Sequence, residues 1–342
     1  MMTMADGLQP DEFAATAARA VIACAGLAVR EQAQNLAGDG LLGVIADEEV
    51  GGLALPLGFA VPVIAAAHAG LLGFPLLETI LVGRLLQSSL TRLAAAIVSG
   101  ETLATVAWQG EAFAEREGGL QVLSGTVARA ACAAKVDYIL VRMNAGTAAL
   151  IPTDAEGVVV EEAAGLDLTV PEHVVRLQKV EVPIGSVLPA GTWDLLNSDA
   201  NVLRAAAILG SAEACLALAQ EHASTRRQFG HALSYNQAIR HALARQKLGL
   251  ESIRHAITRS LSEGGGPVQR DAAFLAAATY GSSISEGALQ LHGGMGFTWD
   301  VPVHRHLRRI RTLQAQGDAS GLISTFGRRY VSEIAPFAEA EA

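Results

Sequence analysis

The chain has few cysteines, few aromatic residues and little charge for its 342 residues. Its three cysteines, Cys24, Cys132 and Cys215, lie far apart and form no C-x-x-C pair, so we expect small buried side chains and no metal or redox site. Charged residues make up 17% and hydrophobic residues 51%, which excludes a disordered chain. Basic residues are also fewer than acidic ones, 25 against 34. The net charge of −9 argues against sequence-independent binding of nucleic acid, which requires a basic face.

No membrane span is expected, although the mean hydropathy of +0.32 is high for a soluble chain. The excess of apolar residues instead indicates a substantial oligomer interface. The first residues contain no basic stretch followed by an apolar segment, so no signal peptide is predicted and the cytoplasm is the expected compartment.

Hydrophobic periodicity divides the chain into three predicted domains, residues 1–100, 101–190 and 191–342. The first has the period of amphipathic helices, interrupted at glycines, and predicts a small helical domain. The second changes to short β-branched runs that alternate apolar and polar residues. This pattern is typical of half-buried antiparallel strands and predicts a β-barrel or sandwich.

The third region predicts long helices over residues 201–227, 237–261, 268–292 and 303–314, with a further helix after Asp318. Long amphipathic helices joined by short links form an up-down bundle. The predicted fold is therefore α+β and mainly α, with an N-terminal helical domain, a middle β domain and a C-terminal four-helix bundle.

The first motif that carries chemistry is T-R-R-Q-F-G at residues 225–230, followed by Gln237. A guanidinium at a helix end, beside the N-terminus of the next helix, can bind phosphate together with free backbone N–H groups. Gln237 could hydrogen-bond a base edge. The alternative is a plain helix–turn–helix corner with solvated arginines.

The second motif is Q-L-H-G-G-M-G-F at residues 290–297. Its three glycines at a helix end permit positive φ and close approach of the backbone to a ligand. Since no strand precedes it, it is not a Rossmann fingerprint, and the chain also lacks Walker A, G-x-S-x-G and H-E-x-x-H motifs.

In this order, the two motifs resemble the signature of the acyl-CoA dehydrogenase family. Two further stretches strengthen the resemblance, L-A-G-D-G-L-L-G-V-I-A-D-E-E-V-G-G near the N-terminus and G-F-T-W-D-V-P-V-H-R-H-L-R-R near the C-terminus. The latter is especially similar to a subgroup that acts on bulky, steroid-like acyl-CoA esters, commonly as two different subunits. The resemblance implies the same three-part fold as the periodicity.

The resemblance also implies that FAD is the cofactor and that the two motifs contact its ADP half, across a boundary between protomers. Arg226 is implied to contact the pyrophosphate, and Phe229 to pack near the adenosine. The other implied cofactor-binding residues are Gln237, Gln290, Gly293 and Gly294.

The chain departs from the family at the base that takes the α-proton of the substrate. Relatives carry a Glu in a Y-E-G-T loop, where this chain has Gly317 followed by Asp318. Asp318 is the candidate catalytic base, and the alternative is that it caps the last helix. At two other positions where relatives place this carboxylate, the chain has Asp199 and Arg245, and an arginine is no base near neutral pH.

The middle region departs from the family as well. The T-E-P-G-A-G-S-D loop is replaced by A-W-Q-G-E at residues 107–111, and the segment that meets the flavin ring reads V-A-R-A at residues 127–130. A glycine-rich lead-in at residues 118–125 is retained. Trp108 is expected to pack within the β domain, and the basic run at residues 304–311 is expected to be a solvated or subunit-contact face.

Together these observations predict a subunit of an FAD-dependent acyl-CoA dehydrogenase that forms a 2,3-enoyl-CoA from an acyl-CoA thioester. The resemblance implies an electron-transfer flavoprotein as electron acceptor and a homo- or hetero-oligomer with a second family subunit. The alternative is a non-catalytic partner subunit that donates ADP-binding residues to the FAD of a complete subunit. A flavin monooxygenase or nitroalkane-oxidase-like enzyme is a third alternative that rests on Asp318 alone.

Overall fold

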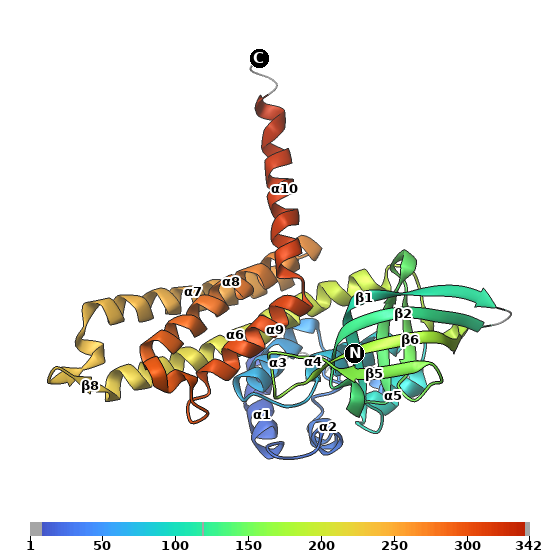
Figure 1. Cartoon of the computed structure of the whole chain (residues 1–342), viewed down its shortest axis with the longest axis horizontal. Coiled ribbons are helices and arrows are strands. Elements are labelled where there is room, and N and C mark those ends of the chain that lie inside the picture. Colours follow the sequence, from blue (N-terminus) through green and yellow to red (C-terminus); the bar gives the residue numbers. More distant parts are fainter. Residues whose placement is uncertain (1–8, 118–119, 339–342) are drawn as a thin grey trace.

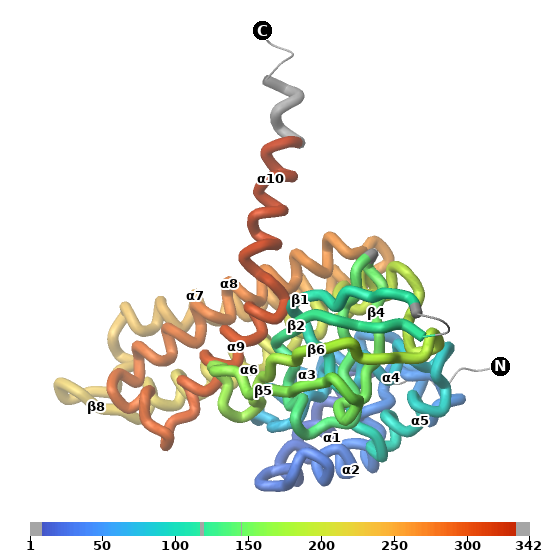
Figure 2. The backbone as a smooth tube through the Cα atoms, turned by 45° about the vertical axis from the view of Figure 1, so that its right-hand side comes forward, coloured from blue at the N-terminus to red at the C-terminus, as the bar shows by residue number. Residues whose placement is uncertain are grey.

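The computed structural model describes residues 9–117 and 120–338 and has the predicted order of helices, then strands, then helices. The sheet and the N-terminal helices lie at one end of the molecule, and the long C-terminal helices extend away from them (Figures 1 and 2). Gly118 and Gly119 of the glycine-rich lead-in, and residues 1–8, lie outside the described residues.

The N-terminal region consists of α-helices that pack their apolar faces into a common core. They are α1 (Pro10–Ala23), α2 (Val29–Gly38), α3 (Ala60–Ala69), α4 (Leu76–Leu86) and α5 (Thr91–Val98). Helix α1 begins at a proline with Asp11 and Glu12 in its first turn, where carboxylates favour the helix dipole. At the start of helix α2, Glu31 Oε2 accepts the backbone N–H of Ala28 at 2.9 Å.

The middle region forms a mixed sheet of seven described strands. They are β1 (Ala104–Glu117), β2 (Leu120–Ala131), β3 (Tyr138–Met143), β4 (Ala148–Pro152), β5 (Val158–Glu162), β6 (Glu172–Pro183) and β7 (Val187–Leu188). Their order is β5-β6-β2-β1-β3-β4-β7, and β1 pairs with β3 in parallel while the other neighbours are antiparallel. The parallel pair differs from the predicted antiparallel arrangement, because alternation along a strand does not report the direction of its neighbour.

The C-terminal region is helical, with a small hairpin inserted. Its elements are α6 (Thr192–Thr225), β8 (Arg227–Gln228), β9 (His231–Ala232), α7 (Gln237–Leu261), α8 (Pro267–His292), α9 (Val303–Gln316) and α10 (Ala319–Ala338). Helices α6 to α9 pack side by side, as predicted for the bundle, and α10 stands away from the body of the molecule (Figures 1 and 2).

Helix α6 is the central helix of the fold. Among the described residues it is the one helix long and apolar enough to cross a membrane, yet 78% of its most apolar window is buried inside the molecule. Helix α3 crosses it so closely that a Cβ added to Gly210 would lie 1.9 Å from the carbonyl oxygen of Ala65. The apolar character of α6 therefore belongs to a core helix that joins the N-terminal helices to the bundle.

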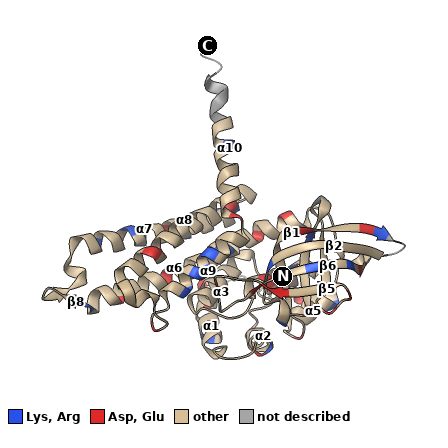
Figure 3. Cartoon of the chain, viewed as in Figure 1, with Lys and Arg blue, Asp and Glu red and all other residues tan. Residues whose placement is uncertain are grey.

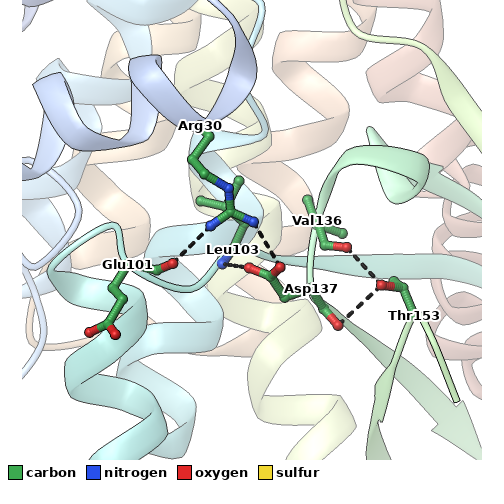
Figure 4. A network of polar contacts seen from close by, with 6 residues as sticks. All are labelled: Arg30, Glu101, Leu103, Val136, Asp137 and Thr153. Carbon is green, nitrogen blue, oxygen red and sulfur yellow. Dashed lines mark hydrogen bonds and ion pairs between the residues drawn. The ribbon is translucent and has the colours of Figure 1, made fainter.

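A network of polar contacts fixes α2 to the sheet (Figure 4). Arg30 donates to Asp137 Oδ1 and to the carbonyl oxygen of Glu101, both at 2.8 Å. The second oxygen of Asp137 accepts the backbone N–H of Leu103 at 2.7 Å, just before β1. Thr153, at the end of β4, donates to the carbonyl oxygen of Val136 at 2.8 Å. The network thus joins the start of β1, the start of β3 and the N-terminal helices.

Each of the three regions contains one free, buried cysteine: Cys24 directly after α1, Cys132 directly after β2, and Cys215 within α6. Burial raises the pKa of Cys24, and raises those of Cys132 and Cys215 to about 12. The three thiols are therefore small buried side chains, as predicted.

Candidate cofactor and active-site region

The first motif lies where α6 meets the β8–β9 hairpin, at the end of the bundle farthest from the sheet (Figure 1). Arg226 caps α6 through its backbone N–H, and its exposed guanidinium makes no hydrogen bond within the described part of the chain. Phe229 at the hairpin turn has a φ of 53° and is 93% exposed. Left-handed backbone is costly for a phenylalanine, so this turn is a strained position of the chain.

The second motif begins where α8 ends. Gly293 follows the last residue of α8 with φ 59° and ψ −138°, a conformation that glycine adopts far more readily than other residues. Residues Gly293–Phe297 then form a 3-10 turn with Met295 and Phe297 exposed. Gln290 is exposed on the last turn of α8.

A pair of stacked histidines brings the two motifs together. His222, in the last turn of α6, stacks on His292, the last residue of α8, with ring centroids 4.4 Å apart. Nδ1 of His292 is 2.8 Å from the carbonyl oxygen of Ala288. Burial, the neighbouring His292 and the cation of Arg226 all lower the pKa of His222. The ends of α6 and α8 are therefore neighbours, and we call residues 225–237 and 290–297 the bundle tip.

The bundle tip suits an anionic ligand with an aromatic group. Its six residues predicted to bind the cofactor are all exposed: Arg226, Phe229, Gln237, Gln290, Gly293 and Gly294. An unpaired guanidinium near glycine backbone can bind a diphosphate, and an exposed phenylalanine can pack on a ring. The fold thus gathers these residues from two distant stretches of sequence.

The position of the expected catalytic glutamate is closed to any side chain. Gly317 directly follows α9, and a Cβ added there would lie 2.5 Å from Cζ of Phe274 and 3.1 Å from Cδ of Arg204. Phe274 and Arg204 are both fully buried, so neither can swing into solvent. The replacement of the family's Glu by Gly is therefore coupled to the packing around it.

Arg204 is the residue that fills this space. Its guanidinium carbon lies 4.0 Å from the ring centroid of Trp108, and Nη1 donates to Asn197 at 3.0 Å and to Asn201 at 2.7 Å. Nε and Nη2 have no partner among the described residues. Burial lowers the pKa of Arg204 to about 9, although Glu78 acts to raise it. Arg204 thus remains a cation at neutral pH in the centre of the molecule.

Trp108 and Glu78 complete this buried cluster. Nε1 of Trp108 donates to Oε1 of Glu78 at 2.9 Å, and the ring of Trp108 lies 6.1 Å from that of Trp193. Burial raises the pKa of Glu78, while the bond from Trp108 and the charge of Arg204 act to lower it. Trp108 therefore packs between α4 and α6, and it does not face an open cleft.

The two altered segments of the sheet also make internal contacts. Nε2 of Gln109 donates to the carbonyl oxygen of Ala315 at 3.1 Å, which ties β1 to the end of α9. Arg129 donates to Glu172 at 2.7 Å, and the other oxygen of Glu172 accepts from Gln316 at 3.0 Å. The cavity beside Glu78 and Gln316 has a volume of about 40 Å³, room for a few waters and too small for a flavin ring.

Asp318 makes the contact of a helix cap. It lies at the N-terminus of α10 with a φ of 46°, and its Oδ1 accepts the backbone N–H of Gly321 at 3.1 Å. Its side chain is exposed and borders an open recess of about 590 Å³.

The other two positions considered for a base are occupied differently. Asp199 is bound by Arg84 at 3.1 Å and by Arg270 at 2.5 Å, so it joins α4 and α8 to α6. Arg245 is exposed on α7.

The basic run at residues 304–311 is not a fully solvated face, because three of its basic residues are buried: His304, His306 and Arg309. Nε of Arg309 donates to Asp167 at 2.6 Å in a buried ion pair. Arg308 and Arg311 remain exposed, and over the molecule Lys and Arg are interspersed with Asp and Glu (Figure 3).

Sequence reasoning missed the buried cluster around Arg204. A signal existed, because Arg204 is the one charged residue between Asp199 and Glu213 in the most apolar stretch of α6. A charge in such a stretch must be paired or stacked when it is buried. The partners Trp108 and Glu78 lie on other elements, so spacing along the chain could not identify them.

The known proteins that this chain resembles are acyl-CoA dehydrogenases. Residues 195–319 match the family model described as acyl-CoA dehydrogenase, C-terminal domain. Acyl-CoA dehydrogenase FadE34 of Mycobacterium tuberculosis is 30% identical over 80% of this chain and 38% of its own length. Acyl-CoA dehydrogenase IpdE2 of the same organism is 34% identical over 32% of this chain and 34% of its own length. The chain therefore spans little more than a third of these curated relatives.

Solved structures share the fold over nearly the whole chain. The ChsE4-ChsE5 complex from Mycobacterium tuberculosis contains a chain that matches with a TM-score of 0.87 and 23% identity, covering 97% of this chain and 99% of that one. Butyryl-CoA dehydrogenase from Megasphaera elsdenii matches with a TM-score of 0.84 and 20% identity, covering 95% and 99%. The Tcur3481-Tcur3483 steroid ACAD G363A variant matches with a TM-score of 0.86 and 22% identity, covering 95% and 98%.

Proposed function

We propose that this chain is a subunit of a heteromeric FAD-dependent acyl-CoA dehydrogenase. The premise is that residues 195–319 match the C-terminal domain of the acyl-CoA dehydrogenases and that the chain has their fold. In that enzyme a second subunit of the same family supplies the base, and an acyl-CoA thioester becomes a 2,3-enoyl-CoA. This chain acts as the partner that donates ADP-binding residues. We propose a cytoplasmic location, and an electron-transfer flavoprotein as electron acceptor, on the resemblance.

The observation that carries the partner role is the closed position at Gly317. A glutamate there would collide with Phe274 and with the buried cation Arg204. The residues around Gly317 therefore do not fit a catalytic glutamate, and no proton transfer is assigned to them.

The residues of the bundle tip do fit the ADP half of the cofactor. Arg226 would pair with a phosphate, Phe229 would pack on the adenosine, and Gln237 would meet the adenine end. Gln290, Gly293 and Gly294 would line the path between them. When bound, FAD supplies the acceptor for the hydride that leaves the β-carbon of the substrate. The contribution of this chain is to hold and orient the part of FAD remote from that chemistry.

Two of the solved neighbours support a heteromeric enzyme. One is the ChsE4-ChsE5 complex, and the other is the Tcur3481-Tcur3483 steroid ACAD variant. On that basis we propose bulky, steroid-like acyl-CoA esters as the substrate class.

The test of this function is the FAD content of the purified oligomer after the substitution Arg226→Ala. Loss of a charge-assisted phosphate contact weakens binding by ~1.5–3 kcal/mol, roughly 10- to 100-fold in affinity. The matched control is Arg227→Ala, which removes the adjacent exposed arginine in β8 and should leave FAD content unchanged. Unchanged flavin in the Arg226 variant would contradict the assignment. Turnover by this chain alone, with one FAD bound per chain, would contradict the partner role.

A further inference from the structure

Two histidine rings lie between the parts of the bundle tip that are assigned to a diphosphate. His222 stands one helical turn before Arg226, and His292 directly precedes Gly293. The two rings are stacked with their centroids 4.4 Å apart and their planes at 29°. An anion held between the guanidinium and the glycine turn therefore lies beside this pair of rings, to which the function proposed above gives no part.

The two rings differ in how they are held. His292 is 8% exposed, and its Nδ1 donates to the carbonyl oxygen of Ala288 at 2.8 Å. His222 is half-buried, and its ring nitrogens make no hydrogen bond to the described part of the chain. A proton on each ring would put like charges on two stacked rings, so the pair binds only one. His222 is therefore the ring that can take up a proton.

The surroundings of His222 contain little negative charge. Burial is the first cause that lowers its pKa, followed by the charges of His292 and Arg226. On α8 the carboxylate of Glu286 lies six residues before His292 and is bound by Arg311. The other titratable groups on elements that meet this end of α6 are Glu221 on α6 itself, His231 in β9, Tyr235 before α7, Arg240 and His241 in the first turns of α7, and His304 in the first turn of α9. Of these, only Glu221 carries a negative charge at neutral pH, so without a bound anion the ring of His222 is neutral.

We propose that His222 is a further anion-binding group of the bundle tip, which takes up one proton from solvent when a diphosphate binds beside Arg226. The imidazolium then adds a second positive charge next to the guanidinium, and His292 remains stacked on it as the neutral ring. This inference rests on the function proposed above, because the diphosphate is that of FAD. It adds that the hold of this chain on FAD is linked to a proton.

The direction of the pH dependence follows from this linkage. The negative charges of a diphosphate beside His222 favour its charged form, so the pKa of the ring is higher in the FAD-bound state than in the free state. Between these two pKa values the bound state holds a proton that the free state lacks. The affinity for FAD therefore rises as the pH is lowered through this interval. One group can change the affinity by at most about tenfold per pH unit.

The dissociation constant of FAD from the purified oligomer, measured between pH 8 and pH 6 from the fluorescence of released FAD, tests this inference. We expect the affinity to rise about three- to tenfold from pH 8 to pH 6. The diphosphate of FAD is a diester that does not titrate in this range, so the ligand adds no slope of its own. A flat profile, or an affinity that falls toward pH 6, would overturn the proposal.

Variants of His222 assign the slope to this ring. His222→Phe keeps an aromatic ring for the stack and removes the titrating group, so we expect its affinity for FAD to stay constant from pH 8 to pH 6. His222→Gln, which needs no aromatic packing, should be equally flat and guards against a folding defect of the Phe variant. The matched control is His241→Phe, which removes an exposed histidine near the start of α7 and should keep the full slope. A slope that persists in both His222 variants, or disappears in the control, would overturn the proposal.

Arg226→Ala separates a failure of this inference from a failure of the proposed function. If Arg226→Ala weakens FAD binding while both His222 variants keep the slope, the function stands and the role of His222 is wrong. If Arg226→Ala leaves FAD binding unchanged, the proposed function is wrong, and the role of His222 is wrong with it.

Discussion

At the scale of single residues, the chemistry of this chain is decided by what surrounds Gly317. The cation of Arg204 lies on Trp108, and Phe274 closes the other side. If only the glutamate were missing, a neighbouring carboxylate could take its role. Here a buried cation and two aromatic rings pack around Gly317, so the change extends through several elements.

We expect Gly317→Ala to destabilise the protein, because its Cβ meets Phe274 at 2.5 Å while the glycine has an ordinary φ of −90°. Overpacking of a filled core costs about 1–3 kcal/mol. Chemical denaturation measures this difference. Gly185→Ala is the control, since nothing lies within 4 Å of an added Cβ there. Equal stabilities of the two variants would show that the space at Gly317 is open.

Asp318→Asn distinguishes a helix cap from a catalytic base. Asparagine caps a helix about as well as aspartate but takes no proton. Because Asp318 accepts the N–H of Gly321, we expect stability and turnover of the assembled enzyme near those of the unmodified protein. Asp318→Ala, which removes the cap, should lose about 1 kcal/mol of stability. A fall in turnover of ~10²–10⁴-fold in the Asn variant would identify Asp318 as the base instead.

At the scale of elements, α9 is held against the N-terminal helices and the sheet by buried polar groups. His306 and Arg309 lie on its inner face, Arg309 binds Asp167, and His68 of α3 lies close by. Burial, followed by the charges of Arg309 and Arg305, lowers the pKa of His306 to about 3 from 6.5. The folded protein therefore keeps this ring neutral.

This shift predicts a dependence of stability on pH. Between about pH 3 and 6.5 the unfolded chain binds a proton at His306 and the folded chain does not, so the free energy of unfolding falls as the pH is lowered through this window. One proton gives a slope of at most about 1.4 kcal/mol per pH unit. Denaturation at pH 7 and pH 5 should show a smaller fall for His306→Gln. His255→Gln, at an exposed position on α7, should retain the full dependence.

The elements differ in how far the sequence predicts them. The bundle helices follow from apolar spacing and from turns that break it, and the predicted range 237–261 coincides with α7. The parallel pairing of β1 with β3 could not be predicted, because β2 intervenes in the chain and no local pattern encodes that crossover. The buried state of Arg309 was missed for a similar reason, since its partner Asp167 is distant in sequence.

At the scale of the whole molecule, the structure brings together two motifs that are distant in the sequence. Two motifs with glycines and an arginine pair retain their spacing at the bundle tip, and the ends of α6 and α8 bring them together through His222 and His292. The closure around Gly317 arises from α4, β1, α6 and α8 at once. The sequence showed that the glutamate was missing but not that Arg204 and Phe274 had taken its place.

The closed region predicts the cofactor content of the assembled enzyme. If this chain contributes only its bundle tip, a pair made of this chain and a complete family subunit should contain one FAD and not two. Flavin absorbance and amino-acid analysis of the purified complex give this ratio. A ratio of two per pair would show that this chain also holds a flavin of its own and would contradict the partner role.

The three buried cysteines can serve as probes of how often each region of the molecule opens to solvent. Cys24, Cys132 and Cys215 belong to the N-terminal helices, the sheet and the bundle respectively, and burial with a raised pKa makes each thiol slow to react. The rate at which each becomes alkylated therefore reports how often its own region exposes it to solvent. Three equal rates would mean that the chain opens as one cooperative unit, and three different rates would rank its regions by local stability.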